Sequence, residues 1–230
     1  MEKFEQEKER EIYYAKIDFF TNVAHEIRTP LTLINGPLEN ILLKKTVDPE
    51  IREDLNIMKQ NTERLLSLTN QLLDFRKTES QGFRLNFAEC NVTEVLKETY
   101  NRFTSLARQR ELDFVLNVGE QDFYAHVNKE AFTKIVSNLL NNAVKYAETY
   151  VHVFLEMNGI GEKRMFYIRT VNDGVIIPNE MKEEIFKPFV RFNEKEDGKV
   201  TTGTGIGLAL SRSLAELHQG SLMMLEGEEA

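Results

Sequence analysis

A histidine, a glutamate and a threonine lie close together in NVAHEIRTPL, residues 22–31, a stretch with a helical pattern. At about 100° per residue, His25 falls roughly 165° from the centre of the apolar stripe of this helix. An exposed imidazole beside an acid is a candidate nucleophile, because an acid that accepts from Nδ1–H leaves Nε2 free to attack. Thr29 projects from the same face one turn later. A buried structural histidine would lie on the stripe and is disfavoured, whereas geometry alone leaves an exposed histidine without function as an open alternative.

The element that must position His25 is a long amphipathic helix. Its apolar residues are spaced by three and four, which defines one helix face. Pro30 lacks an N–H for the carbonyl of Glu26, so a bend is expected just beyond His25. The residues of this stripe are Phe20, Val23, Ile27, Leu31, Ile34, Leu38 and Ile41.

A second amphipathic helix follows a short interruption at 44–50, where Asp48-Pro49 forms a good cap and first-turn pair. Two such helices joined by a short loop predict an antiparallel hairpin over residues 1–80. One hairpin cannot bury both stripes well, so we expect a homodimer that forms a four-helix bundle. The second stripe comprises Ile51, Leu55, Met58, Thr62, Leu65, Thr69 and Leu72.

Residues 81–230 have a different sequence pattern, in which short segments of alternating apolar and polar residues lie between predicted helices. Helices are expected over 92–110, 128–148, near 179–187 and over 205–218, with strands between the first three. This interleaving predicts a mixed α/β sandwich as a second domain.

The predicted helix over 128–148 carries polar residues on one face. Asn138 and Asn142 are four residues apart, and Lys145 and Tyr146 follow one turn after Asn142. The Asn142 amide oxygen suits Mg²⁺, Lys145 offers a point charge to phosphate, and Tyr146 offers a flat apolar surface to a base. Taken alone, the segment is better explained as an asparagine-containing surface helix, so this interpretation depends on what accompanies it.

Two further segments have the residues of a nucleotide site. TVNDGVIIP, residues 170–178, closes a strand and turns through Asp173-Gly174. TTGTGIGLAL, residues 201–210, places Gly203, Gly205 and Gly207 directly before a helix, where backbone N–H groups can hold triphosphate oxygens. A flexible linker would have a similar composition.

Together these segments resemble, in order, the motifs of the sensor histidine kinases. FFTNVAHEIRTPLTLINGPLENIL resembles their phosphoacceptor box, and NLLNNAVKYA resembles the N-box. TVNDGVIIP is similar to the adenine-binding box, IFKPFVRF (185–192) to the F-box, and GTGIGL to the second glycine box. The resemblance covers nearly the whole chain and implies a Bergerat-type ATP-binding domain at 81–230, apparently without its last strand.

The adenine-binding box departs from the family pattern at two positions. Asn172 stands where the family has aspartate, with Asp173 one residue later, and Ile176 replaces the second glycine. An asparagine carbonyl and an aspartate can both accept from the adenine 6-amino group, so Asn172 and Asp173 both remain candidates. The missing glycine puts the loop geometry in question more than the activity.

The resemblance implies ATP-dependent phosphorylation of His25, with Mg²⁺, and transfer to an aspartate of a response regulator receiver domain. It implies Glu26 as base or orienting partner, and Thr29 as the residue that positions water for receiver dephosphorylation. Asn142 is the implied metal ligand, and Phe186 and Phe189 are expected to pack under the nucleotide, although they also suit an ordinary core. The implied nucleotide-binding residues are Asn138, Asn142, Lys145, Tyr146, Asn172, Asp173, Gly174, Phe186, Phe189, Gly203, Thr204, Gly205, Gly207 and Leu208.

Composition and net charge limit which other functions the chain could have. The net charge of −8 argues against nucleic-acid binding, and the single Cys90 fits a reducing compartment. No apolar run suits a membrane span, so we expect a cytoplasmic portion of a sensor kinase anchored only through segments outside this chain. A gyrase-type ATPase is a rival, but Asn138 occupies the position of its glutamate base. A non-catalytic dimerising scaffold is the other rival, favoured only by Ile176.

Overall fold

The computed structural model describes residues 2–44, 48–80, 83–158, 165–192 and 205–225. The chain divides into two compact units, Met1–Phe83 and Arg84–Ala230. The sequence predicted a domain boundary between residues 80 and 81. This division into compact units does not test that boundary, which stays a prediction. No helix among the described residues combines the length and apolar character that crossing a bilayer requires.

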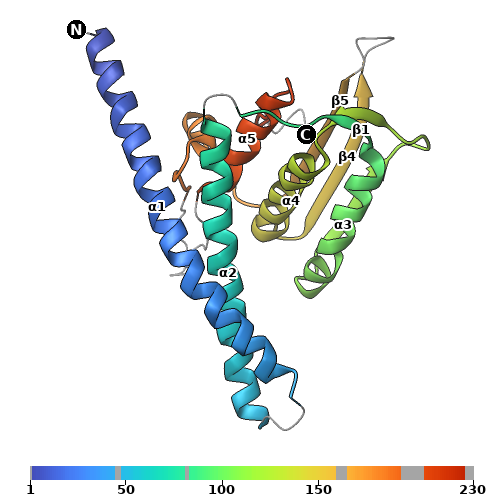
Figure 1. Cartoon of the computed structure of the whole chain (residues 1–230). Helices are drawn as coiled ribbons and strands as arrows, with labels where there is room; N and C mark the ends of the chain where they lie inside the picture. Colours follow the sequence, from blue (N-terminus) through green and yellow to red (C-terminus); the bar gives the residue numbers. More distant parts are fainter. Residues whose placement is uncertain (1, 45–47, 81–82, 159–164, 193–204, 226–230) are drawn as a thin grey trace. The chain divides into compact units, whose positions relative to one another are not determined.

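The first unit is a hairpin of α1 (Glu2–Leu42) and α2 (Pro49–Glu79), which run antiparallel (Figure 1). α1 remains helical through both Pro30 and Pro37. Asp48 caps α2 by accepting from Glu50 N–H, with Pro49 at the first helical position, as the sequence predicted. At the C-terminus of α1, the Arg52 guanidinium donates to the carbonyls of Leu42 (2.9 Å) and Lys44 (2.8 Å), which have no partner within the helix.

The apolar stripe predicted for α1 is only partly buried. The buried positions repeat every seven residues: Leu31 and Leu38 of that stripe, with Ile17 and Ala24 outside it, are at most 8% exposed. Ile27, Ile34 and Ile41, which the sequence placed on the same face, are exposed, as are Ile51, Met58 and Leu65 on α2. Thr62, Thr69, Leu72, Leu73 and Phe75 supply the buried face of α2. A single hairpin therefore covers only part of its apolar surface.

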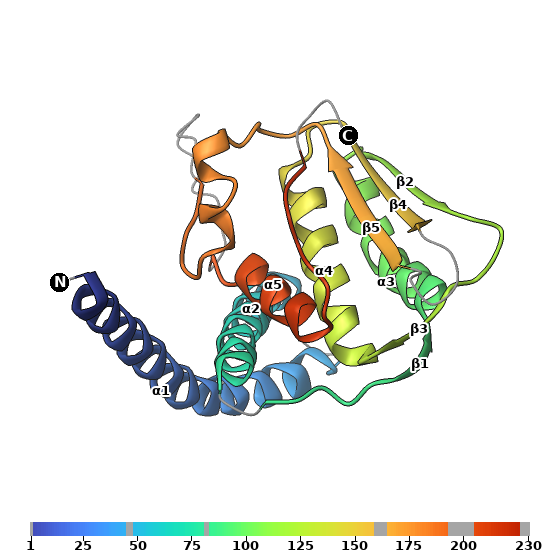
Figure 2. The same ribbon diagram turned by 90° about the horizontal axis from the view of Figure 1, so that it is seen from above.

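The second unit packs helices on one face of a sheet, and Figure 2 shows these layers from above. Strand β2 (Asp113–Val118) pairs in parallel with β4 (Tyr150–Asn158), which pairs antiparallel with β5 (Met165–Asn172). A separate antiparallel pair joins β1 (Ala88–Asn91) to β3 (Tyr124–Val127). The mixed α/β sandwich predicted for this part of the chain is confirmed.

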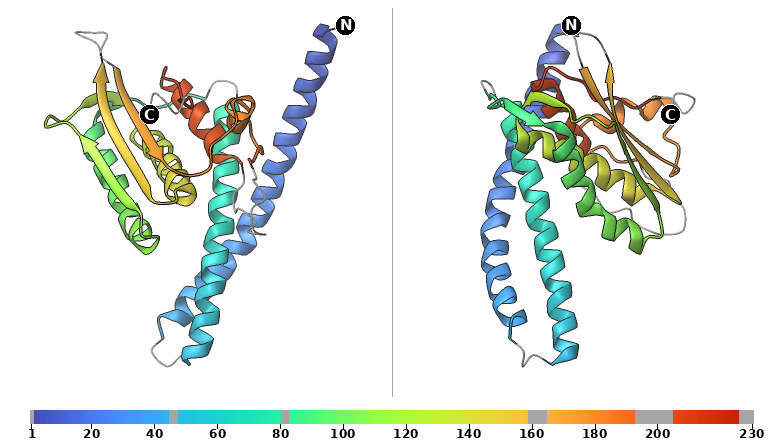
Figure 3. Two further views of the ribbon diagram at one scale, coloured as in Figure 1. Left: turned by 180° about the vertical axis from the view of Figure 1, so that it is seen from behind. Right: turned by 90° about the vertical axis from the view of Figure 1, so that its right-hand side faces the viewer.

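Helices α3 (Val92–Gln109) and α4 (Lys129–Tyr146) cover the inner face of the sheet (Figure 3). Alternation along β4 explains this face, since Val151, Val153 and Leu155 are buried while the residues between them point outward. α5 (Gly207–Leu217) follows near α4. The helix expected near 179–187 was wrong: the segment forms two 3₁₀ turns, η2 (Asn179–Met181) and η3 (Glu184–Phe186). Pro188 limits the segment on its C-terminal side, because it has no N–H to donate and favours the extended conformation that Lys187 adopts (ψ 142°).

Arg110, at the end of α3, caps α4 from outside. Its guanidinium donates to the carbonyls of Val144, Lys145 (2.6 Å) and Ala147 (3.4 Å). The last carbonyls of a helix have no intrahelical partner and lie at the negative end of the helix dipole. A cation at this position therefore stabilises the α4 C-terminus.

We expect Arg110→Ala to lower the free energy of unfolding by about 1–2 kcal/mol, because the last carbonyls of α4 would lose their charged hydrogen-bond donor. Urea unfolding measures this, with Arg108→Ala, exposed in the same last turn of α3, as the control. Equal stability of the two variants would contradict the capping role.

Candidate functional site

The histidine stretch lies on the exposed side of α1. His25, Glu26 and Thr29 are exposed, whereas Ala24, directly before His25, is only 2% exposed. Arg28 in the same turn donates through Nη2 to Asn70 Oδ1 on α2. The backbone under His25 is thus fixed by a buried contact on one side and by a hydrogen bond to α2 on the other, while the imidazole faces solvent.

Adjacent residues on a helix do not face each other, and this bears on Glu26. Within the described part of the chain, the His25 ring and the Glu26 carboxylate share no hydrogen bond. A role of Glu26 as base or orienting partner stays a prediction that requires a rotamer change or a bound substrate.

α4 presents the predicted polar residues opposite its buried face. Asn138 Nδ2 donates to the Gly207 carbonyl (3.2 Å) and to Ser211 Oγ (3.1 Å), so it ties α4 to the start of α5. Asn142, one turn later, is half-buried. Asn138 therefore has a structural task, and Asn142 is the α4 amide better placed to meet a ligand.

At the end of α4, Lys145 Nζ lies 2.8 Å from the Tyr146 hydroxyl and 4.4 Å over the ring centroid. Tyr146 is 41% exposed. A cation above an aromatic face restricts both side chains, which leaves a charged group beside a flat apolar surface. This pair can receive a phosphate and a base.

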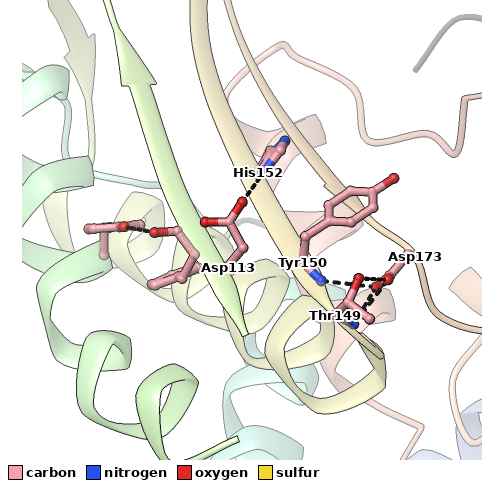
Figure 4. Close-up of polar contacts among 7 residues, drawn as sticks. Asp113, Thr149, Tyr150, His152 and Asp173 are labelled. Atoms are coloured by element: carbon pink, nitrogen blue, oxygen red, sulfur yellow. Dashed lines mark hydrogen bonds and ion pairs between the residues drawn. The ribbon is translucent and has the colours of Figure 1, made fainter. Parts of the chain in front are cut away.

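The turn after β5 is fixed to the turn after α4 through one carboxylate. Asp173 accepts from the backbone N–H groups of Glu148, Thr149 and Tyr150 and from the Thr149 hydroxyl (Figure 4). Desolvation raises the pKa of Asp173, but hydrogen bonds from the Thr149 hydroxyl and from the three backbone groups outweigh it, so the pKa lies well below its usual range. The Asp173 carboxylate therefore holds the turn at residues 148–150 against the end of β5.

Gly174 permits the close approach of the two turns. A Cβ at this position would overlap the carbonyl oxygen of Tyr146 and lie 2.9 Å from Asn172 Nδ2. Ile176, which stands at the second family glycine, is 87% exposed, so its side chain extends into solvent. The absence of that glycine does not create a packing conflict in this loop.

The glycine-rich end of the site is described from Gly205 onward; Gly203 and Thr204 lie outside the described residues. Gly205 has φ +70° and Phe189 has φ +66°, and Phe189 N–H donates to the Gly205 carbonyl (2.9 Å). A Cβ on Gly205 would lie 2.6 Å from the Val190 carbonyl oxygen. Gly207 and Leu208 begin α5, whose N-terminal N–H groups form a favourable environment for anions.

The two F-box phenylalanines have different environments. Phe186 is buried at 7% exposure, and Phe189 is half-buried in the left-handed conformation beside Gly205. The structure thus places Phe186 in the core and Phe189 in the backbone framework of the glycine turn.

The donor set fits a nucleotide with Mg²⁺ better than a metal centre made by protein ligands alone. Among the described residues, no group of three or more His, Cys, Asp or Glu side chains is placed to hold a metal ion. Mg²⁺ commonly takes one or two protein oxygens together with substrate phosphates and water. The Asn142 amide oxygen can serve as such a ligand, and Lys145 and the α5 N-terminus can contact the phosphates.

Sequence reasoning missed three residues that hold this site: Asp173 as a loop anchor, Ser211 as acceptor for Asn138, and Arg110 as a cap on α4. Ser211 is fully buried, and Arg110 lies 34 residues from the first carbonyl it caps. Their partners are distant in sequence, so no local pattern identifies them.

Comparison with known proteins finds two family models. Residues 15–81 match the His Kinase A (phospho-acceptor) domain. Residues 127–229 match the histidine kinase-, DNA gyrase B-, and HSP90-like ATPase family.

Among curated relatives, histidine kinase P4 of Formosa agariphila is 32% identical over 99% of this chain, and sensor histidine kinase WalK of Bacillus subtilis is 28% identical over 89%. The chain spans 17% and 33% of these two relatives.

Among solved structures, full-length ShkA in complex with AMPPNP matches with a TM-score of 0.69 and 23% identity, covering 87% of this chain and 41% of that one. Histidine kinase ThkA in complex with response regulator protein TrrA matches with a TM-score of 0.59 and 25% identity, covering 98% and 63%.

A carboxylate whose pKa is lowered by folding stabilises the fold above its unfolded pKa, and this contribution is lost as the pH falls through the folded pKa. We expect the stability advantage of the wild type over Asp173→Asn to be constant from pH 7 to about 5 and to shrink below about pH 4, near the ordinary aspartate value. Denaturant unfolding across this range tests it.

Thr149→Val provides the matched variant, since it removes the hydroxyl that donates to Asp173. Its effect should be much smaller in the Asp173→Asn background than in the wild type. Additive effects, or an advantage that persists undiminished to pH 3, would contradict the loop-anchor role.

Proposed function

Because this chain belongs to the sensor histidine kinases, with a phosphoacceptor hairpin followed by an ATPase domain, we propose that it transfers the γ-phosphoryl group of ATP to His25. The observation that carries the proposal is the solvent-facing imidazole of His25 on a helix that buries Ala24 and Leu31. In the transfer, Nε2 forms the bond to phosphorus, the bond to the bridging oxygen breaks, and ADP leaves.

The second unit supplies the nucleotide site. Lys145 and the Gly205–Gly207 turn hold the phosphates, and Asn142 gives its amide oxygen to Mg²⁺, which neutralises phosphate charge. Tyr146 lies against the base. Because the Asp173 carboxylate already accepts from the 148–150 turn, Asn172 is the residue we assign to the adenine amino group.

The phosphoryl group then passes from His25 to an aspartate of a response regulator receiver domain. A solved relative in complex with a response regulator supports this partner. Glu26 is proposed as base, and Thr29, exposed on the same helix face, as the residue that positions water when the phosphorylated receiver is hydrolysed. ATP as donor places this chemistry in the cytoplasm.

The exposed apolar residues of the hairpin support a homodimer. Ile27, Ile34 and Ile41 on α1 and Ile51, Met58 and Leu65 on α2 repeat every seven residues and are 38–56% exposed. A seven-residue repeat is the seam of a helical bundle. A second hairpin would cover both stripes and complete a four-helix bundle.

Two residues argue against the rival functions. A gyrase-type ATPase needs a base at position 138, but the Asn138 amide donates to Gly207 and Ser211. A degenerate scaffold was favoured by Ile176, and its side chain extends to solvent.

Incubation with γ-labelled ATP and Mg²⁺ should label the wild type and leave His25→Gln unlabelled. Asn142→Asp should reduce the labelling rate by at least about tenfold, since it alters the ligand of the metal. His126→Gln is the control, because His126 is an exposed histidine of the second unit. Label that survives in His25→Gln, or loss of label in the control, would contradict the assignment.

For the dimer, Ile34→Glu and Met58→Glu should each weaken self-association by more than about 100-fold, because a charge would enter an apolar seam. Light scattering over a concentration series measures this. Leu33→Glu is the control: Leu33 is 70% exposed but lies off the repeat. A wild-type protein that remains monomeric at high concentration would exclude the bundle.

A further inference from the structure

Arg212, in the middle of α5, lies outside the motifs of the nucleotide site and makes three different contacts. Its guanidinium donates to the two carboxylate oxygens of Glu183 at 2.8 and 3.4 Å. It also donates to the Leu222 carbonyl at 3.2 and 3.1 Å, and it lies 3.8 Å over the ring centroid of Phe186. One side chain thus joins α5 to the segment containing η3 and to the chain after α5.

The Glu183 contact is an ion pair with charge-assisted hydrogen bonds. The hydrogen bond and the charge of Arg212 hold the pKa of Glu183 below its ordinary value. A planar guanidinium that binds a carboxylate through two nitrogens and stacks on a ring fixes direction as well as distance. Lysine at this position would keep only the charge.

The segment held by Arg212 shapes the glycine turn. η3 ends at Phe186, and three residues later Phe189 N–H donates to the Gly205 carbonyl at 2.9 Å. The Val190 carbonyl closes the space beside Gly205, where a Cβ would lie 2.6 Å away. Residues 183–190 therefore form one wall of the turn from which α5 begins, and Asn138 holds the other side through Gly207.

We propose that Arg212 is a positioning residue for nucleotide phosphates: it clamps residues 183–190 to α5 and thereby keeps the Gly205–Gly207 backbone N–H groups in their binding orientation. This inference rests on the proposed function, because it takes the α5 N-terminus as the phosphate site. Arg212 acts through Glu183 and Phe186 and does not itself touch the nucleotide.

The chain contains a matched arginine for the test. Arg169 donates to Glu156 at 3.0 Å and lies 4.5 Å over the Phe154 ring, and its side chain is 24% exposed, as is that of Arg212. Phe154 and Arg169 are paired across β4 and β5 on the outer face of the sheet, opposite the buried valines that face α4. Arg169 therefore makes the same kinds of contact away from the glycine turn.

The experiment measures four quantities for the wild type, Arg212→Ala and Arg169→Ala. They are the Kd for the Mg²⁺ complex of the β,γ-imido analogue of ATP, the KM and kcat of His25 labelling, and the free energy of unfolding without nucleotide. We expect both variants to be destabilised by similar amounts. Only Arg212→Ala should raise Kd and KM, by about tenfold, with a smaller effect on kcat, because ground-state phosphate binding is what the turn provides.

Arg212→Lys and Glu183→Gln keep the inference testable if Arg212→Ala does not fold. Both should raise Kd by an intermediate factor, since each leaves part of the clamp in place. Unchanged Kd in the Arg212 and Glu183 variants, or an equal rise in Arg169→Ala, would overturn the positioning role. A wild-type protein that binds no analogue would instead contradict the proposed function itself.

Discussion

The orientation of α4 is the constraint on which the proposed nucleotide site depends. Val136, Leu140 and Val144 are at most 1% exposed in the core, so the helix has one allowed rotation and Asn142 must face outward. The helix is held at both ends. Arg110 caps its last carbonyls, and at its start Asn128 accepts from Ala131 N–H while its own N–H donates to His218 Nε2 at 3.1 Å. A rotation or slip of α4 would break the core and both end contacts together, so the polar face is fixed before any ligand binds.

From this fixed helix, the two ends of the site are built by different means. At the end proposed to bind adenine, one carboxylate, Asp173, accepts from three backbone N–H groups, and Gly174 lets the turn approach Tyr146. At the end proposed to bind phosphate, the shape comes from two left-handed residues, Phe189 and Gly205, joined by a hydrogen bond. The phosphoacceptor hairpin differs from the second unit, because part of its apolar surface stays exposed in one chain. In the proposed assembly a second copy of the hairpin covers that surface.

Much of the fold could be predicted from the sequence, because its signals are local. The cap at Asp48-Pro49, the outward phase of His25 and the polar face of α4 follow from spacing of a few residues, and the structure contains them. Which positions of α1 are buried could not be predicted, since the burial of Ala24 and the exposure of Ile27 depend on what the partner helix covers. The roles of Asp173 and Arg212 depend on contacts with residues far along the chain. Hydrogen bonds between distant segments leave no periodic trace.

The proposed function depends on one event: the covalent transfer of a phosphoryl group to the His25 ring from a nucleotide held on α4. Fragmentation mass spectrometry at neutral pH, after incubation of the unmodified chain with ATP and Mg²⁺, locates that phosphate directly. We expect one phosphoryl group on the peptide containing residues 22–31, assigned to His25 and removed by mild acid, as is typical of a phosphoramidate. Phosphate on any other residue, or ATP turnover with no phosphate on the chain, would contradict it.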